Sequence, residues 1–351
     1  MTAPLFATAD DHLREELLRL AAAAGVVPDL ATDAAAALRG WARAPVVVVG
    51  AELVPELARL APTRRDRVYV VAPGAPDGDL FRLALAVGAE SVTALPGSEA
   101  WMVDTLTDLG EAGRPQGLVV GVVGGSGGAG ATTLACALGQ VAATAGPAAV
   151  IDCDALGPGV DRVLGVEGLD GSRWEGLCQT SGRLSARALR EALPQRNHLG
   201  ALSWTAGSTA SLQPFAVREA VAAARRGHDT VVLDLPRAGD GVVEELVARC
   251  DLLLMVVVPT LAGVASAARL GARHRGHADL GLVLRGHGVH EREVVRVTQL
   301  PVAATMPDQR GLAEAIDLGL GPVRSLRGPL GRTCSLLLDG ARAMRPRPAA
   351  A

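Results

Sequence analysis

A glycine-rich loop at residues 124–133 carries the clearest chemical signal in this chain of 351 residues. It follows an apolar run, residues 118–123, that is typical of a buried strand, and an apolar helical stretch comes after it. In a strand, loop and helix of this kind, backbone N–H groups and the helix N-terminus face an anion. The segment therefore predicts a phosphate-binding loop. A plain tight turn is the alternative, because glycine is common in this chain.

The loop lacks the cation that completes most phosphate-binding loops. Residues 125–132 fit the pattern G-x-x-x-x-G-K-[ST] except at the lysine, where Ala131 stands. All 34 basic residues of the chain are arginines, which is typical of a GC-rich coding sequence, so a needed cation should have become arginine rather than alanine. Because a charge-assisted contact is worth about 1.5–3 kcal/mol, we expect nucleotide affinity to be about 10- to 100-fold weaker than in an intact loop.

Three aspartates stand at the ends of apolar runs that are typical of strands. Asp152 and Asp154 follow residues 148–151, and Asp234 follows residues 230–233. A carboxylate at the C-terminal end of a parallel strand points into the ligand crevice, where it suits Mg²⁺. We expect that role for Asp234, while turn formation or helix capping is the alternative for the other two aspartates.

Residues 125–133, G-S-G-G-A-G-A-T-T, resemble the deviant Walker A motif of the MinD/ParA family, G-K-G-G-x-G-K-[TS]-[TS]. Both lysines of the family motif are replaced, one by Ser126 and the other by Ala131. ATP with Mg²⁺ is the cofactor that the resemblance implies, with weak or absent binding. The nucleotide-binding positions would be Gly125, Ser126, Gly127, Gly128, Ala129, Gly130, Ala131, Thr132 and Thr133, and the metal positions Thr132, Asp152 and Asp234.

The resemblance extends over about residues 117–340. The run I-D-C-D-A-L-G-P-G is similar to the switch I segment of the family, which implies that Asp154 positions the attacking water. The run H-D-T-V-V-L-D-L-P is similar to the Walker B strand of CpaE-like members and ends its apolar part at Asp234. Arg285 stands where the family often has the asparagine that follows a later strand.

Continuous apolar runs alternate with Ala- and Leu-rich helical stretches, which predicts βαβ units and parallel sheets buried on both faces. Residues 80–96 resemble the last helix, turn and strand of a receiver domain. The expected fold class is α/β, a P-loop NTPase-like (MinD/ParA) doubly wound parallel sheet preceded by a receiver-like, flavodoxin-like domain. The expected parts are a degenerate receiver-like domain (1–109), a linker (110–117), a P-loop domain with a degenerate Walker A motif (118–344) and a disordered tail (345–351).

The receiver-like domain departs from its family at the positions of phosphoryl chemistry. Gly50 and Ala51 follow the third strand, where a phosphoacceptor aspartate would stand. Ala72 replaces the usual Ser or Thr after the fourth strand, and Leu95 replaces the usual Lys before a proline. We expect an interaction module in which no aspartyl phosphate forms.

Composition favours a folded cytoplasmic protein. With 49% hydrophobic and 20% charged residues, general disorder is excluded, and a net charge of −3 gives no global attraction for nucleic acid or an anionic membrane. Five cysteines without a C-x-x-C pair indicate neither a disulfide framework nor a thiolate metal site. The N-terminus shows no signal-peptide pattern, and Pro259 and Gly263 divide the apolar run at 252–268 into a strand and a helix start.

Two weaker patterns each have two interpretations. The pairs His274/His277 and His287/His290 favour surface histidines over a four-histidine metal site, because no Cys or carboxylate pattern accompanies them. Near the C-terminus, an apolar stripe on one helical face favours packing on its own domain over peripheral membrane contact. That stripe consists of Leu330, Cys334, Leu337, Leu338 and Ala341.

The chain is thus similar to CpaE/TadZ-like members of the MinD/ParA superfamily, and within them to actinobacterial septum-site-determining (Ssd-type) proteins. The resemblance implies a positioning protein for a division or pilus/secretion machine, with protein partners and negligible ATP hydrolysis. A homodimer and peripheral contact with the inner face of the membrane or septum are compatible with it. The alternatives are an active ATPase that uses substitute cations and a DNA-partition protein, although nucleic acid is not the expected partner.

Overall fold

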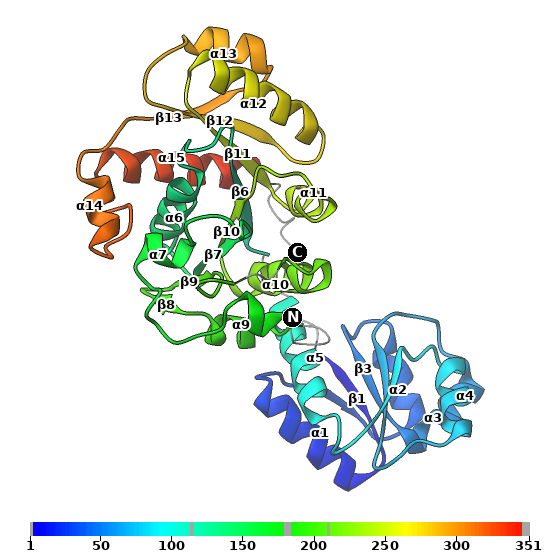
Figure 1. Ribbon diagram of the computed structural model, residues 1–351. Coiled ribbons are helices and arrows are strands. Elements are labelled where there is room, and N and C mark those ends of the chain that lie inside the picture. Colours follow the sequence, from blue (N-terminus) through cyan, green and yellow to red (C-terminus); the bar gives the residue numbers. More distant parts are fainter. Residues whose placement is uncertain (1–2, 113–115, 179–183, 209–210, 346–351) are drawn as a thin grey trace. The chain divides into compact units, whose positions relative to one another are not determined.

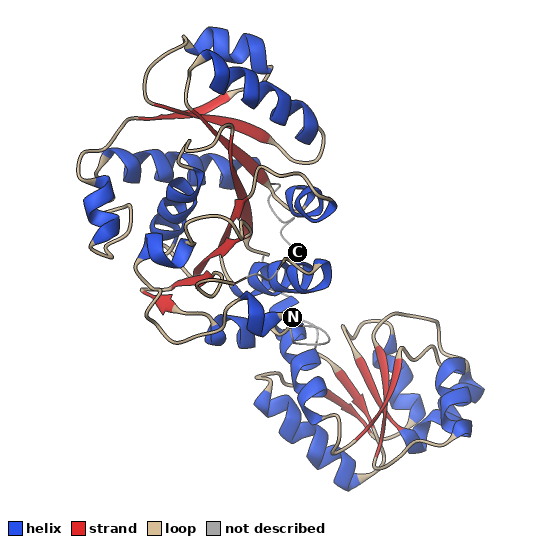
Figure 2. Ribbon diagram, viewed as in Figure 1, coloured by secondary structure: helices blue, strands red, loops and turns tan. Residues whose placement is uncertain are grey.

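The computed structural model describes residues 3–112, 116–178, 184–208 and 211–345. It divides into two compact units, Met1–Arg114 and Pro115–Ala351. Each unit is a parallel or largely parallel sheet with helices on both faces, as Figure 2 shows by colour. The helix at the end of the first unit, α5 (Glu99–Ala112), extends into the stretch expected as a linker, of which residues 113–115 lie outside the described residues.

The first unit contains a five-stranded sheet. Its strands are β1 (Leu5–Ala7), β2 (Asp29–Ala31), β3 (Val47–Gly50), β4 (Val68–Ala72) and β5 (Ser91–Ala94), in the order β2-β1-β3-β4-β5. Helices α1 (Asp11–Ala23) and α5 cover one face, and α2 (Ala34–Trp41), α3 (Val54–Leu60) and α4 (Gly78–Ala86) cover the other. A short 3-10 helix, η1 (Ala51–Leu53), follows β3. This strand order and alternation are those of a receiver-like fold.

The second unit contains an eight-stranded sheet. Its strands are β6 (Leu118–Gly124), β7 (Ala148–Asp152), β8 (Gln195–Arg196), β9 (Leu199–Leu202), β10 (Thr230–Leu235), β11 (Leu252–Val257), β12 (Leu280–Arg285) and β13 (Val302–Met306). The order is β13-β12-β11-β6-β10-β7-β9-β8, and β8 alone among these described strands is antiparallel to its neighbour. The chain leaves β6 toward β7 on one side and later returns to β11 on the other, so β6 lies where the winding reverses. Ligands of doubly wound sheets bind at such a point, beyond the carboxyl ends of the strands.

Helices cover both faces of this sheet (Figure 1). On one face lie α6 (Ala131–Ala142), α7 (Val160–Leu164), α14 (Leu312–Asp317) and α15 (Pro329–Met344). On the other lie α8 (Trp174–Leu177), α9 (Ala186–Ala192), α10 (Pro214–Gly227), α11 (Gly241–Ala248), α12 (Leu261–His274) and α13 (Glu291–Thr298). Because both faces are covered, β6, β10 and β11 are buried along their whole length, which explains their uninterrupted apolar sequences.

The apolar run at residues 252–268 forms β11 and the first half of α12, as expected. The side chain of Thr260 caps α12 by accepting a hydrogen bond from the backbone N–H of Gly263. Within the described ranges, no helix is both long and apolar enough to cross a bilayer.

The C-terminal apolar stripe lies in the core. Leu330, Cys334, Leu337 and Leu338 of α15 are at most 4% exposed and belong to the hydrophobic cluster under α6. The packing interpretation of the stripe therefore holds in this structure. Arg345, at which the disordered tail was expected to begin, lies 3.9 Å from the Asp251 carboxylate, and residues 346–351 lie outside the described ranges.

Candidate functional site

The glycine loop joins β6 to α6 and has the shape of an anion cradle. Gly128 and Gly130 have φ values of +69° and +95°, which L side chains rarely adopt, so glycine is required at both positions for this turn. A Cβ atom on Gly127 or Gly128 would meet no atom within 4 Å, so this side of the loop is open. The loop is fixed at its start, where the Gly125 N–H donates to the Val256 carbonyl at 2.8 Å.

The two positions of the missing lysines differ in their surroundings. Ala131 is the first residue of α6, and its methyl group packs against the apolar cluster below that helix. Ser126 is half-buried, at the start of the loop. Among the described residues, no side chain caps α6, so its first N–H groups have no side-chain acceptor there.

Two of the predicted aspartates are neighbours in the sheet. Asp152 at the end of β7 pairs in register with Asp234 on β10, and both are at least 98% buried. The Thr132 hydroxyl, from the first turn of α6, hydrogen-bonds the Asp234 carboxylate. The fold thus brings together all three residues that the sequence assigned to a metal.

The Asp234 carboxylate is incompletely satisfied. Its Oδ2 atom is buried and has no hydrogen-bond partner within the described part of the chain. Burial raises the pKa of Asp234 to about 7, and the nearby charges of Asp152 and Asp154 add to the rise, against the hydrogen bond from Thr132. A buried anionic oxygen without a partner is costly, and a divalent cation would satisfy it. The residues present therefore fit a Mg²⁺ ion.

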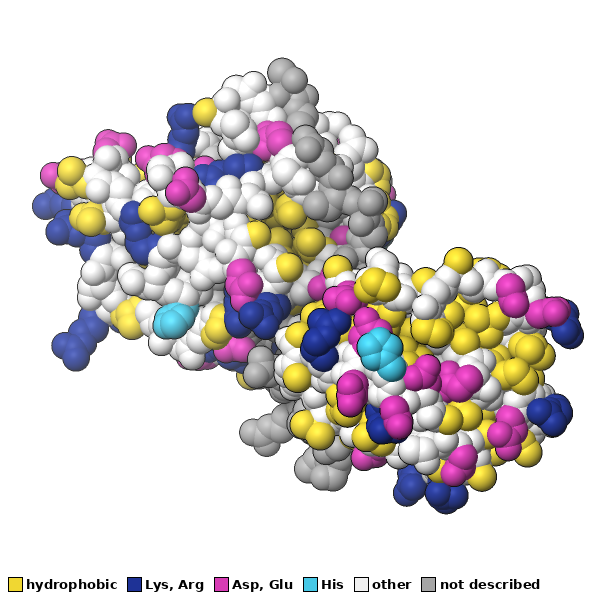
Figure 3. Space-filling view, turned by 90° about the horizontal axis from the view of Figure 1, so that it is seen from below, with side chains coloured by type: hydrophobic (Ala, Val, Ile, Leu, Met, Phe, Trp, Pro, Cys, Tyr) yellow, Lys and Arg dark blue, Asp and Glu magenta, His cyan; other side chains and the backbone are white. Residues whose placement is uncertain are grey.

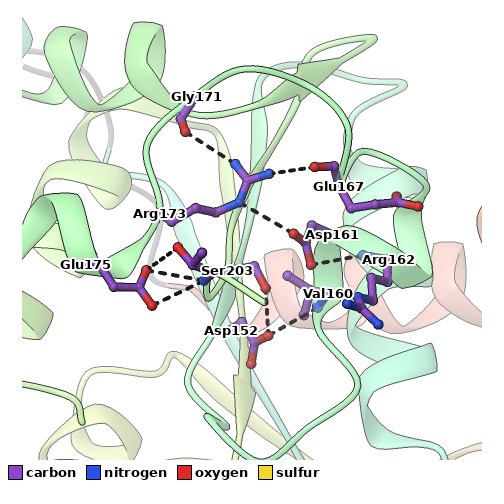
Figure 4. Close-up of polar contacts among 10 residues, drawn as sticks. Asp152, Val160, Asp161, Arg162, Glu167, Gly171, Arg173, Glu175 and Ser203 are labelled. Atoms are coloured by element: carbon purple, nitrogen blue, oxygen red, sulfur yellow. Dashed lines mark hydrogen bonds and ion pairs between the residues drawn. The ribbon is translucent and has the colours of Figure 1, made fainter. Parts of the chain in front are cut away.

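Asp152 is held from several sides (Figure 4). Its Oδ2 accepts hydrogen bonds from the Val160 N–H at 3.1 Å and the Ser203 hydroxyl at 3.0 Å, and its Oδ1 accepts one from the Asp154 N–H at 3.1 Å. Burial raises the pKa of Asp152 to about 6 in spite of these bonds. The indole N–H of Trp174 donates to the backbone carbonyl of Asp152 at 2.6 Å. Sequence reasoning missed Ser203 and Trp174, since no local motif marks either residue.

Asp154 forms a turn. Its Oδ1 accepts the Leu156 N–H at 3.1 Å, and its carbonyl accepts the Gly157 N–H at 2.9 Å. The side chain is partly exposed at the carboxyl end of β7. This is the turn alternative that its sequence position allowed, and positioning of a water molecule by Asp154 stays a prediction.

A cation does lie beside the loop, although it comes from another strand. The Nη1 atom of Arg285, the last residue of β12, is 3.4 Å from the Gly128 carbonyl oxygen and 3.3 Å from that of Ala129. Its Nε atom is 3.3 Å from Oδ1 of Asp308. The sequence marked Arg285 only as a departure from the family asparagine, and its contact with the loop depends on the order of the strands.

In the receiver-like unit, the side chain of Glu52 lies at the carboxyl ends of the strands. After β3, the Oε1 atom of Glu52 accepts hydrogen bonds from the Thr8 hydroxyl at 2.6 Å and the Ala9 N–H at 2.9 Å. Glu52 thereby joins the carboxyl ends of β3 and β1. Asp10, which follows Ala9 in the sequence, caps α1: its side chain accepts hydrogen bonds from the backbone N–H groups of His12 and Leu13.

The histidine pairs do not form a cluster in the described chain. There, no group of three or more His, Cys, Asp or Glu side chains could hold a metal ion. His274 is 3% exposed at the end of α12, where burial lowers its pKa, so one of the four is not a surface residue as expected.

Comparison with solved structures defines the class of the second unit. The ParA family ATPase of Chlorobium tepidum is similar with a TM-score of 0.54 and 16% identity, over 65% of this chain and 98% of that chain. The MinD cell division protein of Aquifex aeolicus matches with a TM-score of 0.52 and 19% identity over 67% and 100%. The MinC:MinD complex of that organism gives a TM-score of 0.52 and 19% identity over 67% and 98%. The fold is thus a receiver-like domain with a MinD/ParA-type P-loop sheet.

Sequence comparison assigns the family. Residues 7–117 match the model described as "Rv3660c-like, CheY-like N-terminal domain". The uncharacterized protein Rv3660c of Mycobacterium tuberculosis strain H37Rv is 36% identical over 328 residues, which cover 88% of this chain and 90% of that protein. The protein named MT3760 from strain CDC 1551 matches equally well. The chain therefore belongs to the Rv3660c-like family.

Proposed function

We propose that this chain is a spatial-positioning protein of the CpaE/TadZ or septum-site-determining type, which places a division or pilus/secretion machine through protein contacts. The proposal rests on one observation: the loop and its surroundings keep most parts of a nucleotide site but lack its lysine. The turn, the buried carboxylates and Thr132 of a nucleotide site are kept, while Ala131 carries only a partly buried methyl group, packed against the core, at the position where a lysine would reach the phosphates. With this combination of residues, we expect the site to bind nucleotide weakly and to hydrolyse it negligibly.

Nucleotide, where it binds, would be held by the N–H groups of residues 125–133 and by the N-terminus of α6. Thr132, Asp234 and Asp152 would hold Mg²⁺, which supplies charge neutralisation at the phosphates when bound. The hydrogen bonds to Asp152 fix the segment between β7 and α7. We therefore expect nucleotide binding to change the conformation of that segment.

Hydrolysis is expected to be negligible for two reasons. Phosphoryl transfer depends on cations aimed at the developing charge, and positions 126 and 131 carry none. Asp154, the candidate for positioning water, already accepts the Leu156 N–H in a turn.

The first experiment measures equilibrium binding and hydrolysis of ATP with Mg²⁺ by the native protein, Ser126→Lys, Ala131→Lys and the double variant. We expect weak native binding, about 10- to 100-fold tighter binding after Ala131→Lys, and no measurable native turnover. Turnover by the native protein at a rate within the range of intact family members would contradict the proposal.

Positioning itself is tested in the cell. A fluorescent fusion of the native chain is expected to concentrate at the septum or at a pole, and Ala131→Lys should change how long it stays there. A fusion spread evenly through cells that are dividing would argue against a positioning role.

One observation favours a second candidate, an active ATPase with a substitute cation. Arg285 lies beside Gly128 and Ala129. In that case Asp234→Asn and Asp154→Asn should abolish ATP hydrolysis, whereas both changes leave a pseudo-ATPase at its background rate.

A further inference from the structure

Arg285 is placed at the rim of the glycine loop by strand order. Its strand, β12, is separated from β6 only by β11, so the carboxyl end of β12 and the loop lie at the same edge of the sheet. A Cβ atom built on Gly130 would lie 3.0 Å from the Arg285 Nη1 atom. The guanidinium group thus hydrogen-bonds Gly128 and Ala129 and lies close to Gly130, just before Ala131, the position of the missing lysine.

The bonds that hold this guanidinium group are weak. They are 3.3–3.4 Å long, whereas a good N–H···O bond is about 2.9 Å. The Asp308 carboxylate that pairs with Arg285 is 74% exposed, and such surface ion pairs contribute about 0–1 kcal/mol. Within the described residues, Nε and Nη1 make the bonds of Arg285, so Nη2 remains available to a ligand.

A second observation, independent of Arg285, points to a ligand at this loop. Asp234 Oδ2 is buried without a partner, and the other contacts of that carboxylate include Thr132 in the first turn of α6. The space over Gly127 and Gly128 is open. A divalent cation at Asp234 with a phosphate chain in the cradle would satisfy both features.

We propose that Arg285 supplies the phosphate-binding cation of this site, from β12 instead of from the loop, and that the ligand is a Mg²⁺-bound triphosphate chain. The inference rests on the proposed function in taking the loop as a phosphate site. A guanidinium group is permanently charged and can donate two parallel N–H bonds to a phosphate. To bind a phosphate in the cradle, the Arg285 side chain would have to rotate away from the loop carbonyls that it contacts.

The test compares two arginines that carry the same charge. Arg310 is exposed, two residues beyond Asp308, so Arg310→Ala changes the net charge as Arg285→Ala does. Binding of Mg²⁺-ATP and of Mg²⁺-tripolyphosphate is measured by calorimetry on the full chain. We expect Arg285→Ala to weaken both by about 10- to 100-fold, and Arg310→Ala to change neither by more than about twofold.

A double-mutant cycle asks whether Arg285 replaces the missing lysine. Ala131→Lys should improve binding much more in the Arg285→Ala background than in the native chain, because the introduced ammonium group then replaces the guanidinium group that was removed. Asp308→Asn, which releases the guanidinium group, should tighten binding a few-fold. Equal gains from Ala131→Lys in both backgrounds, or unchanged affinity in Arg285→Ala, would overturn the proposal.

Two further measurements keep the result interpretable. Arg285→Lys retains a charge, so it should recover part of the affinity if the cation matters, and thermal melting of each variant shows whether the fold is kept. The outcomes are distinguishable from those of the proposed function. Turnover by the native protein or an evenly spread fusion would contradict the proposed function, whereas unchanged affinity in Arg285→Ala would overturn only the assignment of Arg285. Comparing ATP with tripolyphosphate shows whether the base contributes.

Discussion

At the scale of single residues, the two paired aspartates dominate the chemistry of the second unit. Asp152 and Asp234 are both buried and lie side by side on β7 and β10, and the pKa of each is raised. Asp152 has three hydrogen-bond donors, while Asp234 retains an oxygen without a partner among the described residues. The same residue that suits a metal therefore weakens the fold when it is ionised and bare.

Because the Asp234 carboxylate is buried with an oxygen left unpartnered by the described residues, we expect the stability of the fold to depend on pH. The Asp234 carboxyl has a pKa of about 7 in the folded chain and about 3.9 when unfolded, so the folded state holds its proton more tightly. Its contribution to stability is present below pH 4 and is lost as the pH rises to about 7. Asp234→Asn should therefore be more stable than the native chain at pH 8, by about 1–4 kcal/mol, and the difference should shrink at pH 4.

Urea unfolding at pH 4, 6 and 8 measures this effect, with the exposed Asp308→Asn as the matched control. Mg²⁺ should stabilise the native chain at pH 8 and have less effect on Asp234→Asn. Parallel pH profiles for native and Asp234→Asn would show that the Asp234 proton is not linked to folding.

Two tryptophans offer a second comparison at this scale. Trp174 and Trp204 lie 5.9 Å apart between ring centroids, but the Trp174 N–H donates to the Asp152 carbonyl and the Trp204 N–H has no partner in the described chain. Trp174→Phe removes a buried hydrogen bond and should cost about 1–3 kcal/mol more than Trp204→Phe. Chemical denaturation measures both, and equal losses would mean that the indole bond contributes nothing to stability.

At the scale of elements, α15 buries one face against the core and exposes the other to solvent. Leu337 is 4% exposed in the cluster under α6, and its neighbour Leu336 is 63% exposed. Leu337→Ala should destabilise the second unit by about 2–5 kcal/mol, while Leu336→Ala should stay within about 0.5 kcal/mol. Thermal unfolding checks the pair, and similar small losses would indicate that the stripe is not packed in solution.

At the scale of the whole molecule, the 34 basic and 37 acidic residues nearly cancel. The net charge is −3, and on the face that Figure 3 shows, arginines are interspersed with aspartates and glutamates. Nonspecific DNA binding depends on releasing counterions from many phosphates at once, which requires a concentrated basic surface. We expect no retention on duplex DNA at 150 mM salt, measured by gel shift or a filter assay, and salt-sensitive retention would revive the partition alternative.

The sequence by itself determined the strand, loop and helix at residues 118–142, the position of Asp234 at a strand end and the loss of the cation at Ala131. These features are local, because apolar runs and glycine spacing fix each element within a few residues. The alternation of elements also predicted the parallel sheets. The receiver-like fold followed from a softer resemblance at residues 80–96, which the family match supports.

Tertiary structure decided which distant residues meet. Ser203 reaches Asp152 across 51 positions in sequence, and Arg285 reaches Ala129 across 156. Both contacts depend on the order β12-β11-β6-β10-β7-β9, which no periodicity encodes, since a strand carries the same apolar pattern wherever it stands in a sheet. The sequence could therefore show that a cation is missing from the loop, while only the packed sheet brings an arginine beside it.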